Sequence, residues 1–268
     1  MNTQLIEMNV NAGIAMLHLN RPDKRNALND DLRGQLVSAL ERASADREIR
    51  ALVLTGNGKA FCAGGDIAAM TKRLETPLGE VGFNGWSRQQ QVHHSQSLLH
   101  NLPMPTIAAV NGAAAGLGAD TALACDFVIA SRDATFTWSY IHRGLIPDGG
   151  SIYFLPRRVG LATAKELIFS GRTIDAEEAL HLGIADRLSS AESLLEDARA
   201  WAVNLSEGSR TALALGKSIL NQSFESSADQ VFAQGSQAQG ICYTSTEHRD
   251  SVKDFMQKNA SARKGDVP

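Results

Sequence analysis

The sequence predicts an α/β fold with a mostly parallel sheet system, followed by a helical C-terminal part. Short apolar stretches alternate with helical patterns in the first two-thirds of the 268 residues, an order typical of parallel strands joined by helices. From about residue 162 onward the pattern is helical. The hydrophobic content of 43% and the charged content of 21% are ordinary for a soluble globular protein.

These patterns divide the chain into two regions. Residues 1–195 form the predicted α/β core, and residues 196–268 form the C-terminal helical region. The division rests on the change of pattern and not on length, because 268 residues are long for one domain and short for two large ones. Helical ends that follow an α/β core often pack on a neighbouring subunit.

Four short stretches are predicted to be strands. Residues 14–19 alternate in polarity and end at a turn signal, Asn20-Arg21-Pro22. Residues 51–55 form a continuous apolar run closed by Gly56-Asn57-Gly58, which is typical of a buried strand. The same character recurs beside a glycine turn or a helix in two further runs, residues 106–110 and 127–130.

Apolar residues at helical spacing predict the helices. After the first strand they recur at Leu32, Leu36, Leu40 and Ala43, and Asp30 or Asp31 is expected to cap that helix. Short helices are expected after two glycine turns, at residues 67–70 and 117–124. The C-terminal helices are predicted at residues 162–169, 176–182, 191–205, 210–222, 228–240 and 247–259.

The stretch at residues 71–86 is predicted to be a mobile surface loop that serves as a lid over a ligand. Four residues, Pro77, Gly79, Gly82 and Gly85, interrupt its pattern. Long loops of this kind in compact proteins are often functional. A helix is expected to follow at residues 88–100.

Composition and charge argue against several classes of protein. The net charge of −3 at pH 7 gives no basic footprint for nucleic acid, and no stretch approaches a membrane span. The three cysteines, Cys62, Cys125 and Cys242, lack a CxxC pair, so we expect neither a disulfide framework nor a structural zinc site. The N-terminus lacks the basic and apolar regions of a secretory signal, and a cytoplasmic protein is expected.

The first informative motif is the glycine turn around Ala63-Gly64-Gly65-Asp66, between a buried strand and a helix. Side chains are small or absent where the backbone would face a ligand. Such a turn presents unpaired N–H groups and the positive end of the helix dipole, which favour an oxygen carrying negative charge. An ordinary strand-to-helix turn with Asp66 as its cap is the alternative.

A second glycine turn, between Asn111 and Asp120, also leads from a strand into a helix. Its glycines at positions 112, 116 and 118 do not fit GxGxxG, so an NAD-dependent Rossmann oxidoreductase is disfavoured. Close packing of a helix on a strand is the alternative use of these small residues. Two N–H donors that converge on one oxygen would form an oxyanion hole, which suits a thioester carbonyl that becomes an enolate.

Six motifs follow one another between about residue 5 and residue 260: Asn20-Arg21-Pro22 with Asn26-Ala27-Leu28, Leu52-Val53-Leu54-Thr55-Gly56, Ala60-Phe61-Cys62-Ala63-Gly64-Gly65-Asp66-Ile67, Pro105-Thr106-Ile107-Ala108-Ala109-Val110-Asn111-Gly112, Cys125-Asp126 and Gly144-Leu145-Ile146-Pro147-Asp148-Gly149-Gly150. Together they resemble the crotonase family, also called the enoyl-CoA hydratase/isomerase superfamily. The resemblance covers nearly the whole chain.

The resemblance implies a crotonase-like spiral of repeated ββα units, a C-terminal helical trimerisation region, and homotrimers that often pair into homohexamers. It implies an oxyanion hole formed by the backbone N–H groups of Gly65 and Leu117. The ligand would be an acyl-CoA substrate, in which coenzyme A is part of the thioester, without a separate cofactor or metal. Its contacts would come from Lys24, Arg25, Ala27, Ala63, Asp66, Ile67 and Tyr140; for Lys24 and Arg25 a solvated basic turn is the alternative.

Three residues bear on the reaction that the resemblance implies. Hydratases of this family hold a water between two glutamates, and the matching positions here are Asp120 and Tyr140. Because aspartate is shorter and tyrosine is a poor base near neutral pH, hydration by paired carboxylates is in doubt. Asp148 resembles the single catalytic acid of one branch of Δ3,Δ2-enoyl-CoA isomerases and of the ring-opening isomerases of phenylacetate breakdown.

The leading hypothesis is therefore an enoyl-CoA isomerase. Asp148 would take a proton from C2 of a 3-enoyl thioester and return it at C4, and a partly desolvated pocket would raise its pKa. A Pro-Asp-Gly turn is the alternative for Asp148, a cap or a buried hydrogen-bonding group for Asp120, and core packing for Tyr140. A 2-enoyl-CoA hydratase of β-oxidation that uses Asp120, and a non-catalytic acyl-CoA-binding protein, stay open. Surface or helix-packing positions are expected for His93, His94 and His100.

Overall fold

A computed structural model describes residues 4–265 and divides the chain into two units, Met1–Leu205 and Ser206–Pro268. The expected boundary between residues 195 and 196 falls inside helix α8 (Leu194–Leu205). Buried residues of α8 pack with Ile14, Val53 and Ile107 of the first unit. Because that packing ties the whole helix to the core, the division comes after α8.

The first unit is built on a six-stranded sheet in the order β1-β2-β3-β5-β7-β10. Only β1 (Ile6–Asn11) runs antiparallel to its neighbour β2 (Ile14–Leu19). The remaining pairs are parallel and join β2, β3 (Ala51–Gly56), β5 (Thr106–Val110), β7 (Phe127–Ser131) and β10 (Arg187–Ser189). All four predicted strands are therefore confirmed, and the sheet is mostly parallel.

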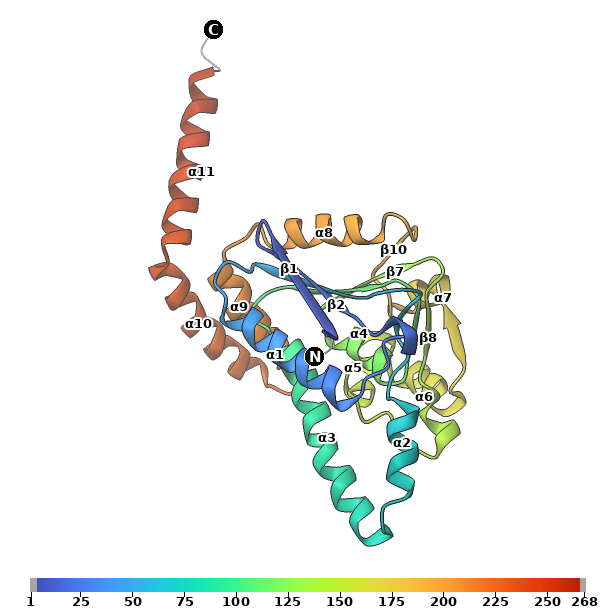
Figure 1. Cartoon of the computed structure of the whole chain (residues 1–268). Coiled ribbons are helices and arrows are strands. Elements are labelled where there is room, and N and C mark those ends of the chain that lie inside the picture. Colours follow the sequence, from blue (N-terminus) through green and yellow to red (C-terminus); the bar gives the residue numbers. More distant parts are fainter. Residues whose placement is uncertain (1–3, 266–268) are drawn as a thin grey trace. The chain divides into compact units, whose positions relative to one another are not determined.

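Both faces of this sheet are covered, which explains the continuous apolar runs of its strands. In β3, Ala51 and Val53 belong to the cluster that packs on α8. The alternate residues Leu52 and Leu54 belong to the larger core cluster on the opposite face. Figure 1 shows α8 over one face and helices α1 (Asp30–Ala45) and α4 (Leu117–Ala124) against the other.

A second, smaller sheet has the order β4-β6-β8-β9. Its members are β4 (Ala60–Cys62), β6 (Ala113–Ala115), β8 (Thr135–Thr137) and β9 (Thr173–Asp175). Along the chain, β3 leads to β4, β5 to β6 and β7 to β8, and each pair of strands is followed by helix. This alternation between the two sheets confirms the expected spiral of ββα units.

Helix α1 begins one residue earlier than expected. The side chain of Asn29, not that of Asp30 or Asp31, caps it by accepting a hydrogen bond of 2.9 Å from the Leu32 backbone N–H. The two aspartates lie in the first turn, where their charge is favourable next to the positive end of the helix dipole. The apolar positions Leu32, Leu36 and Leu40 face the core, as their spacing predicts.

The prediction of a loop at residues 71–86 is wrong, because two helices occupy most of this stretch. Helix α2 spans Ile67–Leu74 and helix α3 spans Leu78–His100. Pro77 stands at the N-cap of α3, where a missing N–H costs nothing. Gly79, Gly82 and Gly85 lie inside α3, so they weaken the helix without ending it. Figure 1 shows α2 and the first half of α3 as neighbouring arms.

Three further helices of the first unit follow β8 along the chain, two of them before β9 and one after it. A 3-10 turn, η2 (Ser139–Arg143), comes before α5 (Ser151–Val159), α6 (Leu161–Ser170) and α7 (Ala176–Leu182). The sequence patterns miss α5, which contains Pro156 near its end. The two later helices agree with the predicted ranges.

The second unit consists of α9 (Arg210–Leu220), α10 (Ala228–Thr244) and α11 (Thr246–Gly265). Within it, the Glu247 carboxylate accepts hydrogen bonds from the Ser209 side chain and from the backbone N–H groups of Arg210 and Thr211, so α11 is tied to the start of α9. No helix in the described part of the chain combines the length and apolar character that a membrane span requires.

Candidate active site

The two glycine turns lie against each other because β4 and β6 are parallel neighbours. A Cβ on Gly64 would lie 2.5 Å from the Ala115 carbonyl oxygen, and one on Gly118 would lie 2.2 Å from the Cys62 carbonyl oxygen. Contacts this short leave no room for a side chain. Gly64 also has a φ of +87°, which residues with a Cβ rarely adopt. Glycine here permits the close approach of the two turns.

Gly65 and Leu117 line the same cavity, which has a volume of about 520 Å³. Neither backbone N–H has a hydrogen-bond acceptor among residues 4–265. Leu28 pairs with the Gly65 turn through the Gly64 carbonyl and the Asp66 N–H, so this pairing leaves the Gly65 N–H unused. Leu117 is the first residue of α4 and has no intrahelical acceptor. Two unpaired donors from separate turns thus border one space.

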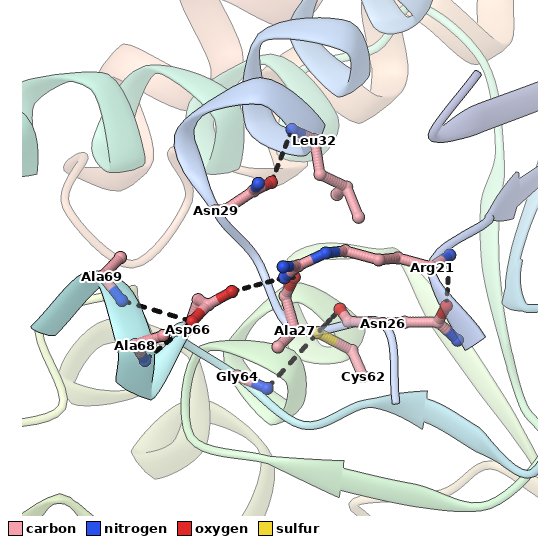
Figure 2. Close-up of polar contacts among 10 residues, drawn as sticks. All are labelled: Arg21, Asn26, Ala27, Asn29, Leu32, Cys62, Gly64, Asp66, Ala68 and Ala69. Atoms are coloured by element: carbon pink, nitrogen blue, oxygen red, sulfur yellow. Dashed lines mark hydrogen bonds and ion pairs between the residues drawn. The ribbon is translucent and has the colours of Figure 1, made fainter. Parts of the chain in front are cut away.

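The Asp66 carboxylate forms hydrogen bonds that stabilise the first glycine turn, as Figure 2 shows. One oxygen accepts from the backbone N–H groups of Ala68 and Ala69 and caps α2. The other accepts from the Arg21 guanidinium at 2.5 Å. The hydrogen bond from Arg21 is the main reason that the pKa of Asp66 lies below its ordinary value. The cap that the sequence offered as an alternative is present.

The predicted coenzyme A contacts near residue 25 lie beside this turn. The Ala63 N–H donates to the Arg25 carbonyl at 2.9 Å, and Arg21 bridges Asp66 to the Ala27 carbonyl. The side chains of Lys24 and Arg25 are exposed and do not line the cavity. Of the seven predicted contacts, Ile67 and Tyr140 do line it.

Helix α3 contributes one wall of the cavity. Val81, Gly85, Arg88 and Val92 recur at helical spacing and line the space, together with Asn84 and Gln89. Opposite walls come from α2, through Met70 and Thr71, and from η2 and the following turn, through Arg143 and Leu145. The segment predicted to be a lid thus borders the cavity, although it is helical.

Asp148 is half-buried and is the one acidic residue among the described residues that line the cavity. Its backbone oxygen lies 3.0 Å from Nε2 of His93 on α3. A carbonyl oxygen only accepts, so Nε2 carries the proton. Burial raises the pKa of Asp148 above its ordinary value, while a hydrogen bond from its own backbone and the charges of His93 and Arg88 oppose the rise. This carboxyl is therefore a stronger base than an exposed aspartate.

Asp120 is fully buried behind the cavity wall and does not line it. The Tyr140 hydroxyl donates to one of its oxygens at 2.6 Å, and the Ser151 hydroxyl donates to the other. Burial raises the pKa of Asp120 to about 7, and the two hydrogen bonds limit the rise. Burial and the nearby Asp120 charge raise the pKa of Tyr140 above its usual value.

Several residues of the site escape the sequence patterns. His93 is exposed, as expected, but the sequence does not predict its contact with Asp148. Ser151 follows Gly149 and Gly150 at the start of α5, and no motif marks it. Arg88 could have been found from its helical spacing to Val81 and Val92, had the loop been read as a helix. Among the described residues, no group of three or more His, Cys, Asp or Glu side chains could hold a metal ion.

Known proteins resemble this chain over nearly its whole length. The model of the family described as enoyl-CoA hydratase/isomerase matches residues 9–265. A probable enoyl-CoA hydratase of Rhodobacter capsulatus is 36% identical over 261 residues, which cover 96% of this chain and 97% of the relative. The 1,2-epoxyphenylacetyl-CoA isomerase of Escherichia coli is 35% identical over 257 residues, with the same coverage of 96% and 97%.

Solved structures share the fold. The crystal structure of an enoyl-CoA hydratase/isomerase from Cupriavidus metallidurans superposes with a TM-score of 0.88 at 35% identity, covering 95% of this chain and 94% of that one. An enoyl-CoA hydratase from Bacillus anthracis also has a TM-score of 0.88, at 28% identity, covering 95% of this chain and 97% of that one. The similarity includes the helical C-terminal region.

Proposed function

This chain belongs to the enoyl-CoA hydratase/isomerase family, the crotonase superfamily, and on that premise we propose that it shifts the C=C bond of an enoyl-CoA by proton transfer. It is an enzyme of the hydratase/isomerase type, and its family acts on CoA thioesters. The observation that supports isomerisation is the shared cavity of Gly65, Leu117 and Asp148, with one acidic side chain in its wall.

The proposed reaction uses one base and two backbone donors. The thioester carbonyl would accept hydrogen bonds from the N–H groups of Gly65 and Leu117, which have no other acceptor among the described residues. Asp148 would take a proton from C2, leaving a dienolate whose charge rests on the carbonyl oxygen. Each such donor contributes about 3 kcal/mol when charge develops. The same carboxyl then returns the proton at C4.

Hydration finds less support in this geometry. Two catalytic carboxylates would need to face one water, and the second candidate, Asp120, lies behind Tyr140 and is fully buried. The Tyr140 hydroxyl is protonated and donates a hydrogen bond to Asp120, so it does not act as a base. We therefore propose no proton transfer by Asp120, and we assign Tyr140 to the wall that contacts the acyl group.

Coenzyme A binding is proposed along the first glycine turn. The exposed cations Lys24 and Arg25 would meet the phosphates, and Ala27, Ala63 and Asp66 would offer backbone atoms beside them. Ile67 would contact the part of the thioester that enters the cavity. No separate cofactor enters this proposal, because the base and the donors come from the chain.

A homotrimer or homohexamer is also part of the proposal. The second unit, helices α9 to α11 and the turn between α9 and α10, exposes many large apolar side chains in this single chain: Leu220, Phe224, Phe232, Ile241, Tyr243, Val252, Phe255 and Met256. Apolar surface of this extent is typical of a subunit interface.

The decisive experiment separates the products formed from a 3-enoyl-CoA and from a 2-enoyl-CoA by chromatography against authentic standards, and also determines their masses. We expect the 3-enoyl-CoA to become a 2-enoyl-CoA of equal mass, and Asp148→Asn to lower kcat at least a thousandfold while acyl-CoA binding stays near normal. Asp133→Asn, at an exposed turn, is the matched control. Unchanged turnover by Asp148→Asn would reject the role of Asp148, and a product that gains the mass of water would identify a hydratase.

A further inference from the structure

We propose that Asp120 is a positioning residue, which holds the Asp148 turn against the oxyanion turn through Ser151 and Tyr140. The proposal rests on the function proposed above and adds a residue that never touches the substrate. Asp120 lies in α4, one turn after Leu117, so it starts from the element that carries one oxyanion donor. Its two oxygens accept from two other segments that border the cavity.

The first connection runs to the Asp148 turn. Ser151 is the first residue of α5, three positions after Asp148, and its hydroxyl donates to Oδ1 of Asp120. Gly149, between them, has no room for a side chain: a Cβ would lie 2.3 Å from Oδ2 of Asp120 and 2.4 Å from Cδ1 of Leu117. The backbone next to the proposed base is therefore in direct contact with the helix of the oxyanion donor.

The second connection runs to the cavity wall. Tyr140 donates to Oδ2 of Asp120 at 2.6 Å, and its ring carbons lie 3.7 Å from the position of a Cβ on Gly116. Gly116 comes directly before Leu117 in the oxyanion turn. By holding the phenol, Asp120 fixes a ring that lines the cavity next to this turn.

His93 supplies an anchor on the other side of the Asp148 turn. It donates to the Asp148 carbonyl from α3, while Ser151 connects the following residues to Asp120. The turn is thus held at both ends, and we expect the second anchor to set where the Asp148 carboxyl points. An error of about 1 Å at a catalytic group is enough to slow a reaction about a hundredfold.

Burying a carboxyl costs free energy of desolvation, and an apolar side chain could fill the same space without that cost. Packing alone therefore does not explain an aspartate here. Two other titratable groups act on Asp120, Tyr140 from η2 and Asp148 from its turn, and Asp120 in turn acts on a third, Cys62 from β4. None of the three is a cation, so no ion pair explains the aspartate. What the carboxyl does provide is one acceptor for each of two donors from different segments.

The test compares a variant that can keep both hydrogen bonds with variants that remove them. Asp120→Asn has the same shape, and its Oδ1 accepts from one hydroxyl while its NH2 group donates to the oxygen of the other, so we expect kcat within about threefold of wild type. Asp120→Ala loses both connections, and Ser151→Ala and Tyr140→Phe lose one each. For these three we expect kcat to fall at least tenfold, while the affinity for a saturated acyl-CoA, measured by calorimetry, changes less than threefold.

A second measurement does not depend on turnover. Amide hydrogen exchange of peptides that cover residues 144–155 should become faster in Ser151→Ala and Asp120→Ala and stay at the wild-type rate in Asp120→Asn. Thr121→Ser on the same helix, which keeps the hydroxyl that donates to the Leu117 carbonyl, is the control for α4 itself.

The outcomes separate this proposal from the function on which it rests. If wild type turns over no enoyl-CoA, the proposed function fails, and hydrogen exchange alone decides the positioning role. Equal loss of kcat in Asp120→Asn and Asp120→Ala would show that the carboxyl itself reacts. Normal kcat in folded Ser151→Ala and Tyr140→Phe, with unchanged exchange, would show that Asp120 only fills the core. Either result overturns the proposal.

Discussion

At the scale of single residues, two aspartates on either side of the cavity wall differ in what surrounds them. Asp148 is half-buried, lines the cavity and contacts α3 through its backbone. Asp120 is fully buried and accepts from two hydroxyls. Burial raises the pKa of both carboxyls, but only Asp148 can meet a substrate. The same residue type is therefore proposed as a base at one position and as an anchor at the other.

The pKa of Asp120 predicts how stability depends on pH. In the unfolded chain this carboxyl releases its proton near a pKa of about 3.9, whereas in the folded protein burial raises its pKa to about 7. The folded state therefore binds more protons between these values. The stability contributed by this group is fully present below about pH 4 and is lost as the pH rises through 7. The full effect is on the order of 4 kcal/mol.

We expect Asp120→Asn to remove this dependence, because the amide does not ionise in this range. Urea unfolding of both proteins at pH 5 and pH 8 measures it, and titrating groups that do not interact with Asp120 cancel in the comparison. The variant should gain stability relative to wild type on going from pH 5 to pH 8. An equal difference at the two pH values would contradict the raised pKa.

Gly64 and Gly65 are neighbours with different tolerance for a side chain. At Gly64, alanine would need a φ of +87° and would place Cβ against the Ala115 carbonyl, so we expect a loss of roughly 2–4 kcal/mol in the free energy of unfolding. At Gly65 the added Cβ would meet only Cε of Met70, the flexible end of a long side chain. There we expect a loss below about 1 kcal/mol.

Chemical denaturation of Gly64→Ala and Gly65→Ala tests this difference. Gly34→Ala serves as the control, since nothing lies within 4 Å of that Cβ and the residue is inside α1. Alanine there should stabilise the helix by about 1 kcal/mol. Similar losses at positions 64 and 65 would show that the contact with Ala115 does not constrain the turn.

At the scale of elements, the repeated ββα unit explains why the site forms where it does. The second strand of each unit joins the small sheet, so β4 and β6 become neighbours although 50 residues separate them. The turns that follow these strands then lie against each other. The helices that come next, α2 and α4, begin beside the cavity, where their first N–H groups lack intrahelical acceptors.

Helix α2 depends on Asp66, which caps it and pairs with Arg21. We expect Asp66→Ala to lower the free energy of unfolding by about 2–4 kcal/mol, since it removes a cap and leaves the guanidinium without its partner. Because the pKa of Asp66 is lowered, its contribution is present above the ordinary pKa of about 3.9 and is lost as the pH falls through the folded value.

Unfolding experiments at pH 7 and pH 3 test both parts of this prediction. The difference between wild type and Asp66→Ala should shrink at pH 3, and hydrogen exchange across residues 66–72 should be faster in the variant at pH 7. Asp23→Ala, at an exposed position, is the control. A difference that grows toward low pH would contradict the lowered pKa.

At the scale of the whole molecule, the helical unit predicts association. Its exposed apolar residues include Phe232 of α10 and Phe255 of α11. We expect analytical ultracentrifugation to show a trimer or a hexamer at micromolar concentration. Phe232→Glu and Phe255→Glu should each shift the protein toward smaller species, because a charge in an apolar interface is costly.

Gln237→Glu on α10 controls for the added charge, since this exposed position is polar already. It should leave the sedimentation of the protein unchanged. A wild-type monomer at the same concentration would refute the proposed assembly, and dissociation by all three variants would point to charge and not to apolar contact.

Local patterns were sufficient for much of the fold. Residues 51–55 and 106–110 read as buried strands because both faces of the sheet are covered, and the structure has strands there. The helices at residues 117–124 and 176–182 follow from small or apolar residues at helical spacing. The stretch at residues 71–86 is wrongly predicted to be a loop because its glycines interrupt the apolar pattern. They do not end the helix, whose second half contributes buried residues to the core.

The order of motifs in the sequence by itself determined the family, the two glycine turns and Asp148 as the candidate base. Only the tertiary structure decided that the turns are in contact, that Asp148 reaches their cavity and that Asp120 lies behind Tyr140. The physical reason is one of range. Spacing and steric demands act between near neighbours in the chain, whereas burial, and with it the pKa of a carboxyl, depends on segments that meet only after folding.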